Sequence, residues 1–417
     1  MKVGIIDADL LGRNKHRFPN LVCEKISAYW KEKGASVELL YSYDNIKKYD
    51  AVYISKVFTD TPCPDYLKDE KWLSSHPKIH IGGTGFYFDK APNLPDEIEH
   101  HMPDYHLYDN WIFENVDNAV NEYKNSIMTS EEYSSMTEDE FSKLVTKYKN
   151  KYMIQFKEYL EYSIGFVTRG CFRKCGFCVN KKYSHVFVHS PLEEFYDPSR
   201  KKICMLDDNF LGCPQWKQIL DTIIATGRPF KFKQGLDERL LTDEKCKLLF
   251  NSNYDGDFTF AFDKISDYDL IKSKLELIAK YKGNKSVKFY VLVAYESTDH
   301  VDIEKAFIRI ELLLRYGCLP YIMRFQNVDD APWQKSKYRD LYVALARWCN
   351  QPCIVKKMSF RQFCIANQKL KKPNKDGVIT KCSTLRCMED FESEHPEIAK
   401  KYFDVRMEDI NICKKNK

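Results

Sequence analysis

The chain has 417 residues, of which 44% are hydrophobic and 30% are charged, and its formal net charge at pH 7 is +5. This length predicts two or three domains, and the apolar content is sufficient for each to have a core of its own. The small positive charge is compatible with an anionic substrate, but it gives no indication of nucleic-acid binding.

The cysteine content bears on the cellular compartment. Fifteen cysteines in a chain of this length favour a reduced, metal-binding protein over a secreted disulfide scaffold. The apolar start KVGII is interrupted at once by Asp7 and Asp9, so we expect no signal peptide. No uninterrupted apolar run approaches the length of a membrane span. We therefore predict a cytoplasmic protein without a membrane partner.

Residues 1–112 alternate between strand and helix patterns. Lys2–Ala8 is a short apolar strand, and an amphipathic helix is predicted over Asn20–Lys33. Further buried strands are predicted at Val37–Tyr41, Ala51–Ser55 and Ile79–Ile81. Strands that alternate with helices predict an α/β fold, here a doubly wound Rossmann-like domain with its ligand site at the carboxyl ends of the strands.

The rest of the chain is predicted to form three parts. Segment 113–161 is polar and rich in Glu, Lys, Ser and Tyr, which indicates a helical connector, and 335–417 indicates a mainly helical C-terminal extension. Between them, 162–334 alternates strand and helix again, and six such units fit a partial (β/α)6 barrel. The predicted strands are Ser163–Thr168, Lys202–Leu206, Phe230–Lys233, Phe258–Phe262, Lys288–Ala294 and Pro320–Phe325.

The segment CFRKCGFC places Cys171, Cys175 and Cys178 directly after the first of these strands. Clusters of four irons are usually held by four thiolates, so a local set of three suggests one iron left open for another ligand. Zinc usually has four closed protein ligands, which makes a zinc knuckle the weaker interpretation. Unrelated buried thiols, which need no such spacing, are the other alternative.

This segment resembles the CxxxCxΦC motif of the radical S-adenosylmethionine (radical SAM) superfamily, in which Φ is aromatic. The resemblance implies a partial barrel whose 4Fe–4S cluster binds SAM through its open iron. It also implies reductive cleavage of SAM to a 5′-deoxyadenosyl radical, which takes a hydrogen atom from a substrate that the sequence does not identify. Phe177 matches the aromatic position near the SAM adenine. An electron donor such as flavodoxin or ferredoxin is the implied partner.

The second predicted barrel strand ends in Asp207, Asp208 and Asn209. Many radical SAM proteins carry a Gly-Gly-Glu-like element here that binds the methionine amino group, and this chain lacks it. Its DDNF segment resembles the form found in members with an N-terminal cobalamin-type domain. The three residues are therefore candidate SAM contacts, with Gln234 after the third strand as another candidate. Helix capping or turn formation is the alternative for the acidic pair.

The N-terminal segment resembles cobalamin-binding domains in part. Those domains carry DxHxxG, SxL and GG after successive strands, and here the sequence reads DxDxxG from Asp7, SxV from Ser55, and Gly82–Gly83. The cobalt-ligating histidine is replaced by Asp9, a hard oxygen ligand that is poorly suited to cobalt. One interpretation is cobalamin held near Asp9, Ser55, Gly82 and Gly83 without a protein ligand to cobalt. The other is a domain that no longer binds it.

The sequence therefore predicts a radical SAM enzyme whose reaction stays open. One alternative is a cobalamin-dependent radical SAM methyltransferase. Another, from a different class, is an iron–sulfur regulatory protein that holds the cluster without turning over SAM. A second cluster in the C-terminal extension is not favoured, because the cysteine spacing there matches no ferredoxin pattern. These cysteines are Cys349, Cys353, Cys364, Cys382 and Cys387.

Overall fold

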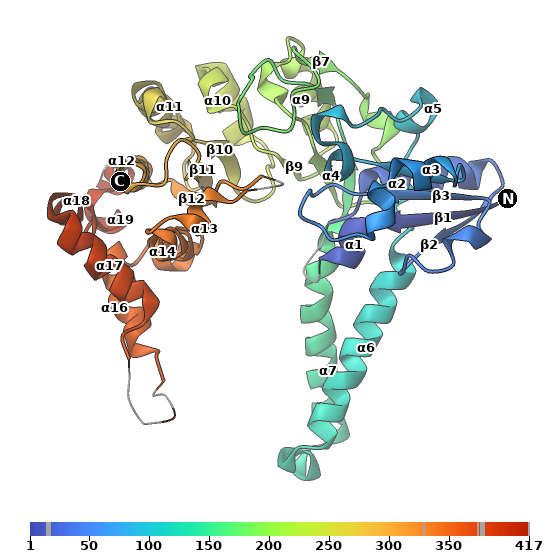
Figure 1. Cartoon of the computed structure of the whole chain (residues 1–417), viewed down its shortest axis with the longest axis horizontal. Helices are drawn as coiled ribbons and strands as arrows, with labels where there is room; N and C mark the ends of the chain where they lie inside the picture. Colours follow the sequence, from blue (N-terminus) through green and yellow to red (C-terminus); the bar gives the residue numbers. More distant parts are fainter. Residues whose placement is uncertain (14–17, 328–329, 373–374, 376–379, 416–417) are drawn as a thin grey trace. The chain divides into compact units, whose positions relative to one another are not determined.

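The computed structural model describes residues 1–13, 18–327, 330–372, 375 and 380–415 (Figure 1). The fold is mixed α/β with parallel sheets, and helices make up 51% of it. The chain divides into two compact units. The first comprises Met1–Val167, Val179–Lys182 and Val188–Leu206, and the second comprises Thr168–Cys178, Tyr183–Phe187 and Asp207–Lys417.

A four-stranded parallel sheet is the centre of the N-terminal part of the first unit. Its strands lie in the order β2 (Ser36–Leu39), β1 (Lys2–Asp7), β3 (Ala51–Ser55) and β4 (Ile79–Gly82). Separate apolar clusters cover the two faces of β1, with Ile5 in one cluster and Ile6 in the other. A strand buried on both faces needs a continuous apolar run, which is the pattern of β1.

Helix α2 (Leu21–Glu32) covers one face of this sheet. Asn20 is its N-cap residue, and the side-chain oxygen accepts hydrogen bonds from backbone N–H groups of the first turn. Ile26 on this helix packs in the same cluster as Val3 and Ile5 of β1. The cap and the apolar stripe together explain why the predicted helix forms at this place in the sequence.

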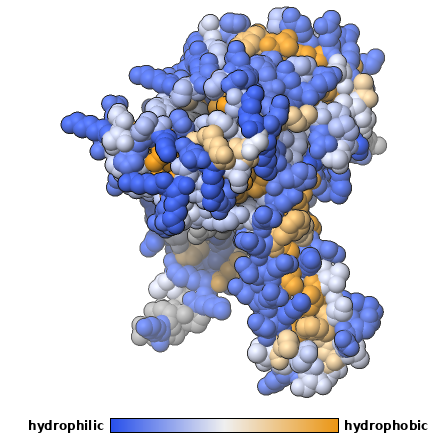
Figure 2. Space-filling view, turned by 90° about the vertical axis from the view of Figure 1, so that its right-hand side faces the viewer, coloured by the Kyte–Doolittle hydropathy of each residue, from blue (hydrophilic) through white to orange (hydrophobic). Residues whose placement is uncertain are grey.

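Two long helices, α6 (Asp109–Met128) and α7 (Glu138–Met153), form a hairpin that extends from this sheet (Figure 1). α7 begins at a capping box built on Thr137. The helices contact each other through apolar and aromatic side chains, and the rings of Tyr123 and Tyr148 stack with their centres 4.0 Å apart. Apolar side chains are also visible along the outside of the hairpin in Figure 2.

The first unit also contains the parallel strand pair β5 (Tyr162–Gly165) and β8 (Lys202–Met205). Arg200, just before β8, is 6% exposed. Its guanidinium donates hydrogen bonds of 2.6 Å to the carbonyl oxygens of Tyr159 and Tyr105. These bonds connect the start of β8 to the segments that precede β5, so the strand pair and the N-terminal part form one compact unit.

Four strands of the second unit follow one another in chain order with helices between them. They are β9 (Phe230–Phe232), β10 (Phe258–Ala261), β11 (Val287–Val293) and β12 (Leu319–Arg324). β10, β11 and β12 form a parallel sheet in that order. The helices between them are α10 (Asp243–Asn251), α11 (Tyr268–Tyr281) and α12 (His300–Arg315), and α9 (Trp216–Ala225) precedes β9. Parallel strands joined in this way have their carboxyl ends at one edge, where polar groups can gather.

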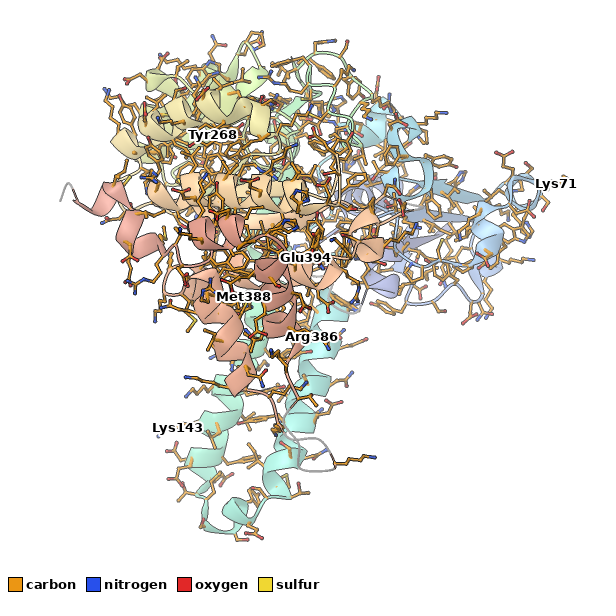
Figure 3. The ribbon with its side chains drawn as sticks, turned by 60° about the vertical axis from the view of Figure 1, so that its left-hand side comes forward. Lys71, Lys143, Tyr268, Arg386, Met388 and Glu394 are labelled. Atoms are coloured by element: carbon orange, nitrogen blue, oxygen red, sulfur yellow. The ribbon has the colours of Figure 1, made fainter. Side chains whose placement is uncertain are left out.

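The C-terminal part of the second unit is helical. Its main helices are α14 (Arg339–Cys349), α16 (Phe360–Lys369), α17 (Ser383–Glu394) and α18 (Pro396–Tyr402). They pack around Phe360, whose ring makes edge-to-face contacts with Trp348 and Phe403. On α17, Met388 is buried whereas Arg386 is exposed, so one face of this helix belongs to the core (Figure 3).

Shorter elements connect these parts. They are α1 (Ala8–Gly12), α3 (Glu70–Ser74), α4 (Thr84–Tyr87), α5 (Asp96–Glu99), α8 (Lys157–Glu161), β6 (Thr168–Arg169), β7 (Phe187–Val188), α13 (Pro332–Lys335), α15 (Pro352–Val355), α19 (Met407–Ile410) and α20 (Ile412–Lys415).

The strands and helices predicted from the sequence are confirmed to within a few residues at their ends. The α/β class and the helical character of 113–161 are confirmed as well. The division at residues 112, 161 and 334 stays a prediction, since the two compact units exchange segments between 167 and 207. In the described part of the chain, none of the helices combines the length and the apolar character that crossing a membrane requires.

Candidate metal centre

Residues 170–178, here called the cysteine loop, follow the short strand β6 in the second unit. Cys171, Cys175 and Cys178 are all half-buried, and the N–H of Cys178 donates to the carbonyl oxygen of Cys175 at 3.1 Å. Gly170 has a φ of +88°, and a Cβ there would lie 2.2 Å from the carbonyl oxygen of His185. The start of the loop therefore requires glycine for both its conformation and its packing.

Two carboxylates hold the start of this loop. Asp207 is fully buried, and its Oδ1 accepts hydrogen bonds from the backbone N–H of Thr168 at 2.6 Å and from the Thr168 hydroxyl at 2.5 Å. Asp208 Oδ2 accepts a hydrogen bond of 2.8 Å from the N–H of Gly170. Both aspartates thus have a structural task, while their predicted contact with SAM stays a prediction.

Asn209 connects the loop to a third segment. Its Nδ2 donates to Cys171 Sγ at 3.5 Å and to Asp237 Oδ2 at 3.3 Å. The side chain is 3% exposed, and its Oδ1 is buried without a hydrogen-bond partner among the described residues. An unpaired buried oxygen is costly. Beside a set of thiols, it indicates the place of a ligand that carries a hydrogen-bond donor.

Two arginines near the thiols share one carboxylate. Nε of Arg173 donates to Asp237 at 2.9 Å, and Nε of Arg239 donates to the other oxygen of the same carboxylate at 2.7 Å. Burial alone would raise the pKa of Asp237, but these hydrogen bonds and charges outweigh it and hold the pKa below its usual range. Arg239 also lies 3.7 Å from Glu238 and 3.9 Å from Asp267, so carboxylates match the charge of the two arginines.

The thiol sulfurs themselves have polar neighbours. Cys171 Sγ accepts a hydrogen bond from the N–H of Arg173 at 3.3 Å, in addition to the bond from Asn209. Burial raises the pKa of the Cys175 thiol, and the charge of Arg239 acts against this shift. Hydrogen bonds to sulfur stabilise thiolates and tune bound iron–sulfur clusters.

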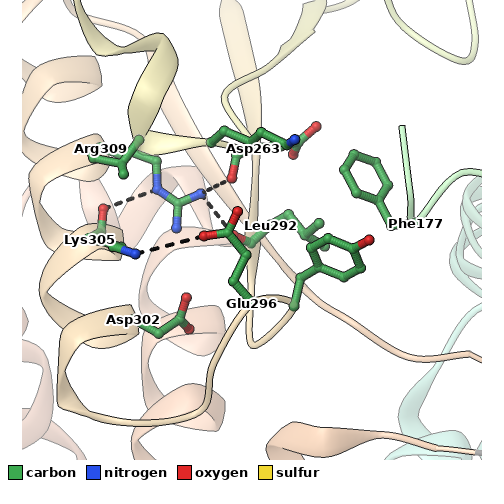
Figure 4. A pocket seen from close by; sticks show the side chains of 10 residues that line it. Phe177, Asp263, Leu292, Glu296, Asp302, Lys305 and Arg309 are labelled. Atoms are coloured by element: carbon green, nitrogen blue, oxygen red, sulfur yellow. Dashed lines mark hydrogen bonds and ion pairs between the residues drawn. The ribbon is translucent and has the colours of Figure 1, made fainter. Parts of the chain in front are cut away.

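A charged pocket lies beside Phe177 at the ends of β10 and β11 (Figure 4). Arg309 of α12 is 2% exposed, and its Nη1 donates to the carbonyl oxygens of Asp263 and Leu292 at 2.8 Å each. Burial raises the pKa of the Asp263 carboxyl to about 6, although the charge of Arg309 opposes this. Arg309 is thus fixed on one side of the pocket, whose free space of about 20 Å³ is that of about one water molecule.

The three thiols do not converge on one point: in the described ranges, no group of three or more His, Cys, Asp or Glu side chains is arranged to hold one metal ion. In a four-iron cube each thiolate binds a different iron, and the sulfurs need not converge on one point. The donor set, the hydrogen bonds to Cys171 Sγ and the unfilled Asn209 oxygen agree with a cluster that has a further ligand.

The N-terminal residues predicted for cobalamin are engaged in packing. Asp9 is fully buried and accepts hydrogen bonds from the N–H groups of Val57 and Phe58 and from the Thr61 hydroxyl. Segment 56–62 is thereby held against the carboxyl edge of the sheet. Ser55 Oγ exchanges hydrogen bonds with the Asn20 side chain.

The two glycines of this edge differ from each other. Gly83 has a φ of +99°, and a Cβ there would lie 2.2 Å from the carbonyl oxygen of Lys56. A Cβ at Gly82 would have nothing within 4 Å. Gly83 therefore serves close packing against Lys56, where a buried cobalamin tail would need space. Together with the saturated Asp9, this geometry does not fit cobalamin.

Other predicted residues have simpler surroundings. Phe177 is half-buried, and Gln234 is exposed just after β9. Arg309 and Asp302 were not predicted from the sequence. Each is a charged residue on the buried, apolar face of the amphipathic helix α12, and that position could have revealed them. The C-terminal cysteines are scattered: Cys349 and Cys364 are buried, Cys353 is exposed, and Cys382 and Cys387 are half-buried.

Comparison with known proteins does not identify the site. Neither a protein-family model nor a curated protein sequence matches the chain. The interpretation of the site consequently depends on its residues and their geometry.

The packing of the N-terminal edge predicts that cobalamin does not bind. Metal-free protein mixed with hydroxocobalamin and passed over a desalting column should emerge without the absorption of cobalamin, because Asp9 and Gly83 are committed to segment 56–62. Visible absorption of the eluted protein is the measurement. Cobalamin retained at one molecule per chain would contradict this account of the edge.

The contacts of Asp207 predict a structural defect in Asp207→Ala. The substitution leaves the buried N–H and hydroxyl of Thr168 without an acceptor, so the free energy of unfolding should fall by about 2–4 kcal/mol. Denaturant unfolding of metal-free protein measures this. Asp221→Ala, on the exposed side of α9, is the control and should change stability little. Equal stability of the two variants would show that Asp207 does not hold the loop.

Proposed function

We propose that this chain is a radical SAM enzyme, which reductively cleaves SAM at a 4Fe–4S cluster and modifies a substrate that is not yet identified. The observation that carries the proposal is the cysteine loop. Its three thiols lie at a strand end among two arginines, an aspartate and an amide with an unfilled acceptor. This set of groups suits a cluster with one open iron to which SAM can bind.

The proposal also extends to the finer fold. We take strands β1 to β4 as a Rossmann-like domain and the strands from β5 to β12 as the units of a partial (β/α)6 barrel, followed by a helical extension. The parallel order β2-β1-β3-β4 and the parallel sheet of β10, β11 and β12 support this assignment. In barrels of this kind, the chemistry occurs at the carboxyl ends of the strands, and the cysteine loop follows β6.

Each residue of the site has a proposed task. Cys171, Cys175 and Cys178 would hold the cluster, which with SAM bound supplies the one-electron cleavage that yields an organic radical. Asn209 Oδ1 would accept a hydrogen bond from the SAM ammonium, a task that Asp207 and Asp208 are less free to perform. Phe177, which the resemblance places near the adenine, would contact the adenosine part.

Arg173 and Arg239 would balance the negative charge of the thiolates while remaining fixed by Asp237. Fixed cations near a cluster favour its reduced form, because reduction adds negative charge. The required electron would come from a small carrier protein such as flavodoxin or ferredoxin. This partner follows from the proposed chemistry.

The alternatives differ in how well the geometry supports them. A cobalamin-dependent methyltransferase is disfavoured, because Asp9 and Gly83 are engaged in packing with segment 56–62. An iron–sulfur regulatory protein needs the same three cysteines, but it has no need for the unfilled oxygen of Asn209. Measuring SAM cleavage distinguishes this second class from the enzyme.

The cysteine assignment predicts a selective loss. Replacing Cys171, Cys175 or Cys178 by Ala should abolish iron retention after anaerobic reconstitution, because two thiolates hold a cube poorly. Formation of 5′-deoxyadenosine on reduction with SAM should be lost too. Cys353→Ala, which removes an exposed cysteine, should leave both intact. A Cys171→Ala protein that still formed 5′-deoxyadenosine would refute the proposed function.

The role of Asn209 predicts a change in SAM affinity. In Asn209→Ala, SAM binding to cluster-loaded protein should weaken by about tenfold to a hundredfold, since a hydrogen bond to a charged group contributes about 1.5–3 kcal/mol. Equilibrium binding of labelled SAM is the measurement, normalised to the iron content of each sample. Asn251→Ala, at the exposed end of α10, is the control. Equal affinities in the two variants would move the ammonium contact to another residue.

A further inference from the structure

Tyr295 lies at the end of β11 and contacts the cysteine loop through its ring. The ring centre lies 5.4 Å from that of Phe177, and the planes are nearly perpendicular at 84°. On its other side, the ring centre lies 4.8 Å from that of Phe325, with an angle of 72°. Tyr295 is thus held between two aromatic rings in the edge-to-face geometry that such pairs prefer.

The hydroxyl of Tyr295 meets the loop at Gly176. A Cβ built on Gly176 would lie 2.1 Å from Tyr295 Oη, and the next nearest atom, Tyr295 Cζ, would be 3.4 Å away. The φ of Gly176 lies outside the left-handed region, so its backbone tolerates a side chain. The hydroxyl alone therefore excludes a side chain at a position between two of the three cysteines.

The backbone that presents Tyr295 is strained and firmly held. Ala294 has a φ of +59°, a conformation that residues with a side chain seldom adopt. It is 1% exposed, and its N–H donates to Asp302 Oδ2 at 2.8 Å. The hydroxyl of Tyr342 donates to the same oxygen at 2.8 Å. Strain of this kind persists where the surroundings fix it, and it is frequent at functional sites.

We propose that Tyr295 is a positioning residue, which sets the conformation of the cysteine loop by contact with Gly176 and Phe177. The Asp302–Tyr342 pair holds the backbone at Ala294. The Tyr295 ring, in a residue that is 37% exposed, is positioned by Phe177 and Phe325 and in turn limits the loop at Gly176. The proposal rests on the proposed function in one respect, namely that this loop holds the cluster. The contact itself is a property of the metal-free chain.

A double-mutant cycle tests the contact. Gly176→Ala should displace the loop, because the new methyl group collides with the hydroxyl; the iron retained at limiting supply should fall by about tenfold. Tyr295→Phe should stay within about twofold of wild type. The double variant should return to within about twofold as well, because the colliding atom is absent. The matched control is Gly176→Ala with Tyr321→Phe, which removes a hydroxyl from β12 and should give no rescue.

Two further readouts complete the experiment: the EPR spectrum of the reduced, reconstituted protein and the unfolding temperature of the metal-free protein. Gly176→Ala should change the EPR spectrum and lower the unfolding temperature. Adding Tyr295→Phe to this variant should restore both. A double variant no better than Gly176→Ala would overturn the proposal. The proposal would also be overturned if the double variant regained the unfolding temperature while iron content and EPR spectrum were identical in all variants. The contact would then affect stability only. A wild-type chain that retains no iron would instead refute the proposed function. The unfolding temperatures of the metal-free variants would still test the contact between Tyr295 and Gly176.

Discussion

The cysteine loop keeps its shape through hydrogen bonds that neighbouring strand ends supply. Asp207 and Asp208 accept hydrogen bonds from backbone N–H groups just before and at the start of the loop. Asn209 donates a hydrogen bond to the sulfur of Cys171. Carboxylates are strong acceptors, and a buried one that already binds two donors holds its partners in a defined geometry. Without these bonds, three thiols on a flexible loop would have no common arrangement to offer a metal cluster.

Much of this fold follows directly from the sequence pattern. Buried parallel strands read as short apolar runs and their helices as amphipathic stretches, so element positions were predictable. The spacing of Cys171, Cys175 and Cys178 was equally informative, because all three lie on one loop. The partners of this loop were not predictable: Asp208 lies 38 residues from Gly170, and only the folded chain shows that Tyr295 faces Gly176.

The N-terminal sheet shows how an aspartate after a strand end can serve packing. Aspartate at position 9 is too short and too hard to serve cobalt, but it is a strong acceptor for backbone N–H groups. The structure uses it in this way, to hold segment 56–62 over the carboxyl edge of the sheet. Gly83, which could have made room for a ligand, allows the same segment to pack closely. Asp9 and Gly83 thus both serve the packing of this segment, while the space beside Gly82 stays open.

The central claim is that three thiolates of this chain hold a cluster whose fourth iron is open to SAM. The most direct test is the EPR spectrum of the reconstituted, reduced protein before and after addition of SAM. We predict a four-iron signal whose g values shift when SAM is added, because SAM becomes a ligand of one iron. A four-iron signal that SAM leaves unchanged, or iron bound only as single ions, would contradict the account.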